Sequence, residues 1–150
     1  MTDYLIRAAS AADLPAIVAL LADDPLGAAR ESPDDLAPYS AAFARIQADP
    51  GHDVFVAERD GVVVGTLQLT IIPGLSRRGM TRALIEAVRI AADQRGGGLG
   101  TLMVRHAIDE ARRHGCGMVQ LTSDATRTDA HRFYERLGFV ASHVGLKLQL

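Results

Sequence analysis

Two neighbouring stretches in the first half of the chain, 54–58 and 62–71, are rich in β-branched apolar residues. Such residues favour extended backbone, and the Asp60-Gly61 dipeptide between the stretches is typical of a two-residue hairpin turn. The pattern therefore predicts an antiparallel hairpin. Pro73-Gly74 ends its second strand, and the apolar run at 83–91 predicts another strand.

Elsewhere the apolar residues recur every three or four positions, as on a helix that buries one face. This period predicts helices near 14–21 and 39–46, the first behind a Ser10–Asp13 pair with the spacing of a capping box. It is clearest in the helix that begins at Leu99, and it returns at 130–137. The apolar side of the Leu99 helix consists of Leu99, Met103, Val104, Ala107, Ile108 and Ala111.

Short apolar runs at 4–8, 118–122, 139–142 and 144–150 predict the remaining strands. The unit at 83–122 runs strand, helix, strand, which requires a parallel and normally right-handed crossover. The expected fold is of the α/β class (α+β type). It is a single domain whose mixed, mostly antiparallel sheet has a central parallel βαβ crossover and about four flanking helices.

The composition of 150 residues, with 48% hydrophobic and 23% charged, suits one domain over 1–150. A net charge of -2 gives no electrostatic case for a nucleic-acid partner. Cys116 is the single cysteine, so no intramolecular disulfide can form. The chain has no signal-peptide pattern and no apolar run long enough to span a bilayer. We therefore expect a cytoplasmic protein without a membrane partner.

No metal site is expected, because the five histidines show no metal-ligand spacing. They are His52, His106, His114, His131 and His143.

The glycine-rich segment Arg95-Gly96-Gly97-Gly98-Leu99-Gly100-Thr101 follows a predicted strand and opens a predicted helix. Free amides and the helix dipole attract an anion at such a junction, and glycines let a phosphate approach the backbone. Arg95 adds a charge that can assist. The alternative is a merely flexible turn, but the position between strand and helix favours an anion site.

Two common nucleotide motifs do not fit this segment. A P-loop requires Gly-Lys-Ser/Thr at the helix start, whereas the only lysine of the chain is Lys147. In a dinucleotide fingerprint the third glycine would fall at Met103, and Ala92–Arg95 would intervene after the strand.

These residues resemble a signature of the GNAT family of N-acetyltransferases, Gln/Arg-x-x-Gly-x-Gly/Ala, here Arg95 to Gly100 behind the strand Val88-Arg89-Ile90. A second segment, 130–139, is similar to the closing helix of that family, with its tyrosine and Leu-Gly-Phe ending. The two occur in order, separated by a helix and a strand. The resemblance covers about the whole chain and is closer from Val54 onward.

The resemblance implies that acetyl-CoA lies with its pyrophosphate on the backbone amides of Arg95 to Thr101, a segment that includes Gly97 and Leu99. Its pantetheine arm would run along the strand at Val88, Arg89 and Ile90. The resemblance also assigns cofactor contacts to Ala130 and Phe133. Many family members carry asparagine seven residues before the tyrosine; this chain has Arg127 there, so the usual amide contact is in doubt and a phosphate contact is the alternative.

The family mechanism is direct attack of a primary amine on the thioester. Tyr134 occupies the family's acid position and would protonate the departing thiolate; the alternative is that it only packs near the sulfur. A phenol (pKa about 10) is a slightly weaker acid than a thiol (about 8.5), so this role requires a site that assists the transfer. A backbone N–H on a bulged strand, near Val88, would bind the developing oxyanion.

Glu86 is our candidate for the base or for the group that positions a relay water. By strict alternation it faces the same side of its strand as Leu84, Val88 and Ile90. A carboxylate on an apolar strand is costly unless it is paired or used. The alternative is an ion pair with a nearby arginine, namely Arg78, Arg82 or Arg89.

The resemblance implies that the acceptor is a small-molecule or peptide amine, between which the sequence does not choose. Arg77 and Arg78 could favour an acceptor with an acidic group. The competing function is a CoA-binding sensor or interaction module without turnover. The resemblance also implies a homodimer through pairing of a sheet edge.

Overall fold

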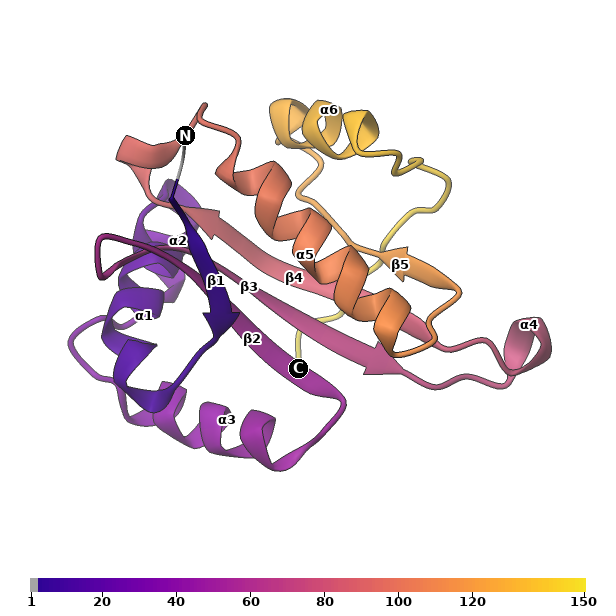
Figure 1. The fold of residues 1–150 in the computed structure, drawn as a ribbon, viewed down its shortest axis with the longest axis horizontal. Coiled ribbons are helices and arrows are strands. Elements are labelled where there is room, and N and C mark those ends of the chain that lie inside the picture. The colour runs from indigo at the N-terminus through magenta and orange to yellow at the C-terminus, as the bar shows by residue number, and fades with distance from the viewer. Residues whose placement is uncertain (1–2) are drawn as a thin grey trace.

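The computed structural model describes residues 3–150 and contains one five-stranded sheet (Figure 1). The strands lie in chain order: β1 (Leu5–Ala8), β2 (His52–Arg59), β3 (Val62–Ile72), β4 (Arg82–Ile90) and β5 (Met118–Gln120). β1 to β4 pair antiparallel, and β4 pairs with β5 in parallel. The mixed, mostly antiparallel sheet is therefore confirmed.

The hairpin between β2 and β3 turns at the predicted dipeptide. Asp60 and Gly61 both have positive φ, 52° and 77°. Positive φ at both central residues defines the tight turn that matches the twist of paired strands, and Asp-Gly adopts it readily. The turn sets the pairing of Arg59 with Val62 and of Glu58 with Val63, and a bulge between Ala57 and Glu58 then shifts the register of the remaining pairs.

Helices cover both faces of the sheet (Figure 1). They are α1 (Leu14–Ala22), α2 (Pro25–Arg30), α3 (Ala37–Ala48), α4 (Ser76–Gly79), α5 (Leu99–Arg113) and α6 (Thr128–Arg136), with short 3-10 turns η1 (Ala11–Asp13) and η2 (Ala92–Gln94). Residues 3–150 thus hold two more helices than the four or so expected, because α2 and α4 are very short. None of these helices has the length and apolarity that a bilayer crossing requires.

The main core lies between the sheet and α5. Leu67, Leu69 and Ile85 of the sheet are almost fully buried there against Met103 and Val104. The amphipathic pattern predicted for 99–115 is confirmed, and Gly115 ends the helix with φ +74°. On the opposite face the sheet packs against α1 and α3, whose inward side chains include Ile17 and Phe43.

The predicted capping box is also present. The carboxylate of Asp13 accepts hydrogen bonds from the backbone and hydroxyl of Ser10, at 2.8 and 3.3 Å. The guanidinium of Arg7 adds two more bonds to the same carboxylate, at 2.8 and 2.9 Å. The Arg7 hydrogen bonds are the main reason that the pKa of Asp13 falls to about 2. This group ties β1 to the first helix.

The prediction of strands at 139–142 and 144–150 is wrong. These residues form no strand, and all residues from 140 to 150 are exposed. Their alternating apolar side chains have β propensity, but a strand also requires ladder hydrogen bonds, and this segment forms none with the unpaired outer edge of β5. Without them β5 is the last strand, so the parallel crossover lies at the edge of the sheet and not in its centre.

Candidate active site

The glycine turn has the backbone shape of an anion site. Gly96 and Gly98 have positive φ, 81° and 86°, and Gly98 is the cap residue of α5. The first amide of the helix ladder is that of Leu102, which donates to the carbonyl of Gly98 at 3.1 Å. The amides of Leu99, Gly100 and Thr101 precede that ladder and have no helical acceptor. They are the donors that a phosphate would take at the positive end of α5.

Space above the turn is open. A Cβ added at Gly96 or Gly98 would meet no other atom within 4 Å, so the backbone is accessible to a ligand. Gly100 differs: a Cβ there would lie 3.3 Å from the ring of Phe133. Gly100 is therefore needed for packing of α6 against the start of α5. Phe133, assigned to the cofactor by resemblance, thus holds the turn and the closing helix together.

Tyr4 and Arg59, which the sequence analysis did not single out, hold the residue before the glycine turn in position. The Tyr4 hydroxyl donates to Oε1 of Gln94 at 2.8 Å, and Nη1 of Arg59 donates to the same oxygen at 3.1 Å. Gln94 directly precedes Arg95, whose Nε donates to the carbonyl of Ile90 at 3.2 Å. No sequence motif indicates these contacts, because they join β1, β2 and η2 across long separations.

A β-bulge interrupts β4 beside this turn. Glu86 pairs with Gln68 and Arg89 pairs with Thr66, so two residues of β4, Ala87 and Val88, oppose the single residue between 66 and 68 on β3. Ala87 has φ +53°, which is rare for a side chain with a Cβ. The bulge expected near Val88 is thus present, and it removes Ala87 and Val88 from regular pairing.

The bulge overturns the predicted facing of Glu86. Glu86 shares a face with Leu84 as expected, since both pair with even-numbered residues of β3. Ile90 pairs with Gly65 and contacts the α5 side, so it lies on the opposite face. The extra residue shifts the alternation by one, which strict period-two counting could not anticipate.

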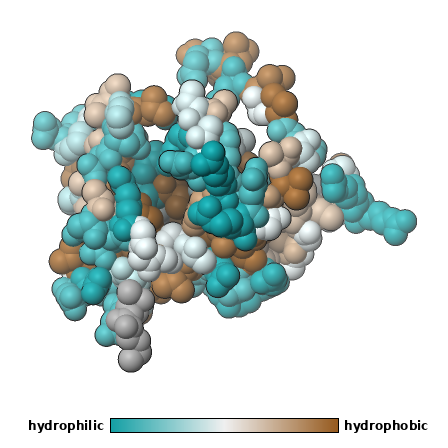
Figure 2. Space-filling view, turned by 90° about the horizontal axis from the view of Figure 1, so that it is seen from above, coloured by the Kyte–Doolittle hydropathy of each residue, from teal (hydrophilic) through white to brown (hydrophobic). Residues whose placement is uncertain are grey.

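The part of β4 after Leu84 is unpaired along the edge that faces β5. The strand pairs with β5 only from Arg82 to Leu84, opposite Met118 to Gln120. Beyond Leu84 the two strands separate, and the unpaired edge of β4 leads toward the glycine turn. Figure 2 views the side of the molecule that carries this turn and α6 in Figure 1, and it shows a hollow with apolar surface at its bottom and polar surroundings. An extended ligand with amides and a phosphate end fits this combination.

Tyr134 is half-buried on α6, between the rings of Phe133 and Phe139, with centroids 5.0 and 5.8 Å away. Its hydroxyl makes no hydrogen bond with any described residue. Burial raises the pKa of Tyr134, while Arg127 and Arg89 oppose the shift. The phenol therefore carries its proton at neutral pH, as a proton donor must.

Glu86 is exposed, and within residues 3–150 its carboxylate forms no ion pair. Of the three arginines considered as partners, Arg89 is occupied elsewhere: its Nε lies 3.3 Å from Oδ2 of Asp24, and its Nη1 donates to the carbonyl of Val88 at 3.0 Å. The explanation of Glu86 as a simple ion-pair member is thus not supported. Asp24 in turn caps α2 by accepting from the amide of Gly27, which lowers its pKa.

Arg127 is exposed and is the cap residue of α6. The preceding loop is held by Asp124, which accepts from the amide and hydroxyl of Thr126 at 2.9 and 2.6 Å. His131 lies against the carbonyl of Asp124 at 2.9 Å. Arg127 also acts electrostatically on both Tyr134 and Asp24, so it lies on the same side of the molecule as the bulged strand.

Arg77 and Arg78 lie away from the bulge and the glycine turn. They belong to α4, which projects from the far end of β3 and β4 (Figure 1). The bulge begins five residues into β4, which in a strand corresponds to about 17 Å from Arg82. This position gives no support to the suggestion that the two arginines contact an acidic acceptor.

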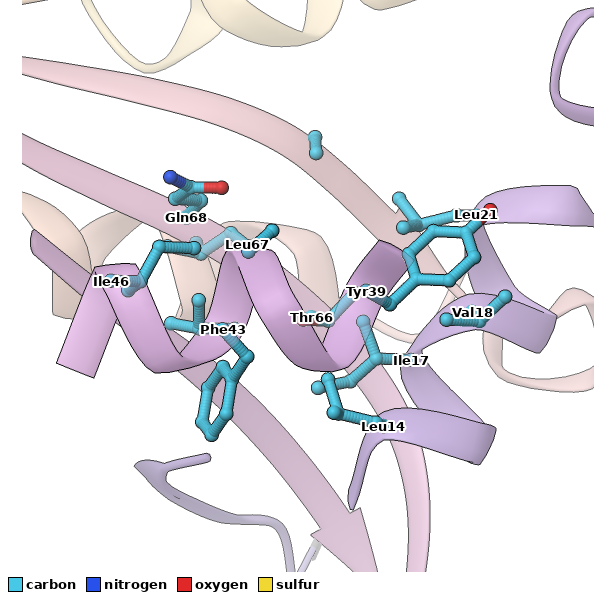
Figure 3. Close-up of a pocket in the computed structure, with 13 residues that line it drawn as sticks. Leu14, Ile17, Val18, Leu21, Tyr39, Phe43, Ile46, Thr66, Leu67 and Gln68 are labelled. Atoms are coloured by element: carbon cyan, nitrogen blue, oxygen red, sulfur yellow. The ribbon is translucent and has the colours of Figure 1, made fainter. Parts of the chain in front are cut away.

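An apolar cavity of about 150 Å³ lies on the other side of the bulge, between the sheet and helices α1 and α3 (Figure 3). Its lining includes Ala87 of the bulge and Gln68, the cross-strand partner of Glu86. The remaining lining residues are Leu14, Ile17, Val18, Leu21, Tyr39, Ala42, Phe43, Ile46, Val54, Thr66 and Leu67. The bulge thus separates an open, amide-rich groove from an apolar cavity.

Comparison with known proteins agrees with this architecture. Residues 14–139 match the model of the acetyltransferase (GNAT) family. The chain is 32% identical to aminoalkylphosphonate N-acetyltransferase of Salmonella typhimurium over 109 residues, which is 73% of this chain and 70% of that protein.

Two solved structures are similar over nearly the full length. The crystal structure of a transcriptional regulator from Bacillus halodurans C-125 has a TM-score of 0.95 at 44% identity and covers 98% of this chain and 99% of its own. A putative acetyltransferase from Agrobacterium tumefaciens str. C58 has a TM-score of 0.87 at 34% identity, with 97% and 99% covered. The match over 14–139, which contains both the glycine turn and Tyr134, decides the assignment: this chain belongs to the GNAT family of acetyltransferases.

Proposed function

We propose that the protein is an N-acetyltransferase that moves the acetyl group of acetyl-CoA to a primary amine by direct attack. The observation that carries this proposal is the junction of three features: a glycine turn with free amides, a bulged strand with an unpaired edge, and a half-buried protonated tyrosine. One domain over residues 1–150 and a cytoplasmic location belong to the same proposal.

The residues present fit acetyl-CoA. The backbone from Arg95 to Thr101, with Gly96 and Gly98 open to solvent, would hold the pyrophosphate. The free edge of β4 at 88–90 offers backbone donors and acceptors for the pantetheine amides. Phe133 of α6 lies against the start of α5, Ala130 precedes it by three residues on the same helix, and Arg127 would supply a charge. Bound acetyl-CoA supplies an acetyl group activated as a thioester.

Two residues of the chain would accept and donate the protons of the reaction. Glu86 would take a proton from the attacking amine, directly or through water, because only the neutral amine is a nucleophile. The new C–N bond forms as the C–S bond breaks, and a backbone N–H at the bulge would face the carbonyl oxygen as it gains negative charge. Tyr134 would give its proton to the departing thiolate. These steps leave an amide and free CoA.

A second candidate function is CoA binding without turnover, in a sensor or interaction module. The similar Bacillus halodurans protein is described as a transcriptional regulator, which makes this alternative concrete. The presence of both Glu86 beside the bulge and a protonated Tyr134 supports catalysis, since a binding module needs neither a base nor an acid.

Thiol release from acetyl-CoA, measured against a panel of small primary amines and peptides, tests the proposal. We expect thiol release with at least one amine. We also expect E86Q to lose most of this release, at high pH as well as at neutral pH. Glu135 is an exposed glutamate on the neighbouring helix, so E135Q is the matched control. CoA binding without release for any amine would establish the binding module instead.

A further inference from the structure

We propose that the acceptor is a primary amine with an apolar body about the size of a benzene ring, bound in the cavity of Figure 3. This inference rests on the proposed function, because the cavity becomes an acceptor site only if the bulge is the reaction centre. Below, the cavity is called the acceptor cavity, with the lining residues given above.

The acceptor cavity lies where an attacking amine must approach. Ala87, the bulge residue with positive φ, lines it. Gln68 also lines it and pairs with Glu86 across the two strands, so the two side chains emerge on the same face of the sheet. An amine at the sheet end of the cavity would therefore lie close to the proposed base.

Size and polarity restrict what the cavity can hold. A cavity of about 150 Å³ lined by Leu, Ile and Phe side chains is of the size that accommodates benzene. Two of its three polar residues are already occupied. The Tyr39 hydroxyl bonds Glu31 and the amide of Ser32 at 2.8 and 2.9 Å, and the Thr66 hydroxyl bonds the carbonyl of Phe55 at 3.0 Å.

No lysine or arginine is among the lining residues. A phosphate or phosphonate in the cavity would lose its hydration without a cationic partner, which is costly. Arg89, on the same sheet face, is already paired with Asp24. The acceptor of this chain thus differs in charge from an aminoalkylphosphonate, the compound class in the name of the Salmonella relative.

Acetylation rates across a defined amine series test this inference. We expect 2-phenylethylamine to exceed 2-aminoethylphosphonate and glucosamine 6-phosphate at least a hundredfold in kcat/KM. In the series from propylamine to hexylamine, kcat/KM should rise about fourfold per methylene until the cavity is filled. Equal or better turnover of the phosphorylated amines would overturn the inference while leaving the proposed function intact.

A substitution at the mouth of the cavity provides the second readout. Ala42 lines the acceptor cavity yet is exposed, so A42F should fill the space without disturbing the core. We expect at least a tenfold loss with 2-phenylethylamine, and little change in CoA affinity. Ala44, exposed on the same helix and outside the lining, gives the control A44F.

Binding of 2-phenylethylamine to the CoA-loaded protein, measured by calorimetry, does not depend on turnover. It therefore tests the acceptor cavity even if the protein is inactive. Binding that A42F abolishes and A44F retains supports the acceptor cavity. No binding, or binding indifferent to A42F, overturns it.

Discussion

The hydroxyl of Tyr4 donates a hydrogen bond to Oε1 of Gln94 at 2.8 Å, across 90 positions of the chain. Arg59 donates to the same oxygen at 3.1 Å, and its guanidinium lies 5.6 Å from the centroid of the Tyr4 ring. Gln94 is the last residue of η2, directly before the glycine turn. One amide oxygen thus connects the turn to the two strands at the opposite edge of the sheet.

We therefore predict that Q94A weakens CoA binding five- to tenfold, because the loss of two hydrogen bonds, about 1 kcal/mol in all, releases the turn from its fixed position. Calorimetry with CoA measures the effect. D93A alters the exposed neighbour in the same 3-10 turn and should bind CoA as the wild type does. Equal losses in the two variants would contradict the anchoring role.

Gly98 and Gly115 allow a matched test of the anion site. They flank the two ends of α5 with similar positive φ, 86° and 74°, and open space lies around both. G98A and G115A should each lower the free energy of unfolding by about 1 kcal/mol, since alanine is strained there. Only G98A should weaken CoA binding, by tenfold or more. If both variants bind equally, the pyrophosphate lies elsewhere.

The ionisation of Tyr134 leads to a prediction about how kcat depends on pH. Burial raises its pKa above the ordinary value of about 10, so the phenol stays protonated up to at least pH 9. We expect Y134F to lower kcat about a hundredfold with little change in CoA affinity, and we expect no loss of wild-type kcat between pH 7 and 9 from tyrosine ionisation. An alkaline limb below pH 9 that disappears in Y134F would contradict the raised pKa, and an unchanged kcat in Y134F would contradict the donor role.

Asp13 leads to a prediction about how the free energy of unfolding depends on pH. Its pKa is about 2 in the folded protein, below the ordinary carboxyl value of about 4. A depressed folded pKa stabilises the protein above pH 4, and this contribution declines as the pH falls toward 2. D13N should lower the free energy of unfolding by about 1 kcal/mol at pH 7. Urea titrations should show the difference narrowing at pH 2, whereas the exposed D34N should show none at either pH.

Features set by neighbouring residues could be predicted from the sequence. The hairpin at Asp60-Gly61, the capping box at Ser10 and the helix Leu99–Arg113 with Gly115 behind it all depend on interactions within a few positions. The glycine turn belongs to this class too, because positive φ and free helix amides are local properties. Its resemblance to an acetyltransferase signature was sufficient to identify the family.

The tertiary structure decided what depends on distant partners. The two-against-one pairing of Ala87 and Val88 is a property of β3 and β4 together, and it reversed the facing of Ile90 relative to Glu86. The strand predicted at 144–150 has the right composition, but no edge in its own chain pairs with it. The Gln94 anchor and the acceptor cavity likewise join residues that only folding brings together. The local sequence pattern indicates which secondary structure a segment can form. Contacts with residues distant in the chain decide which segments it packs against or pairs with.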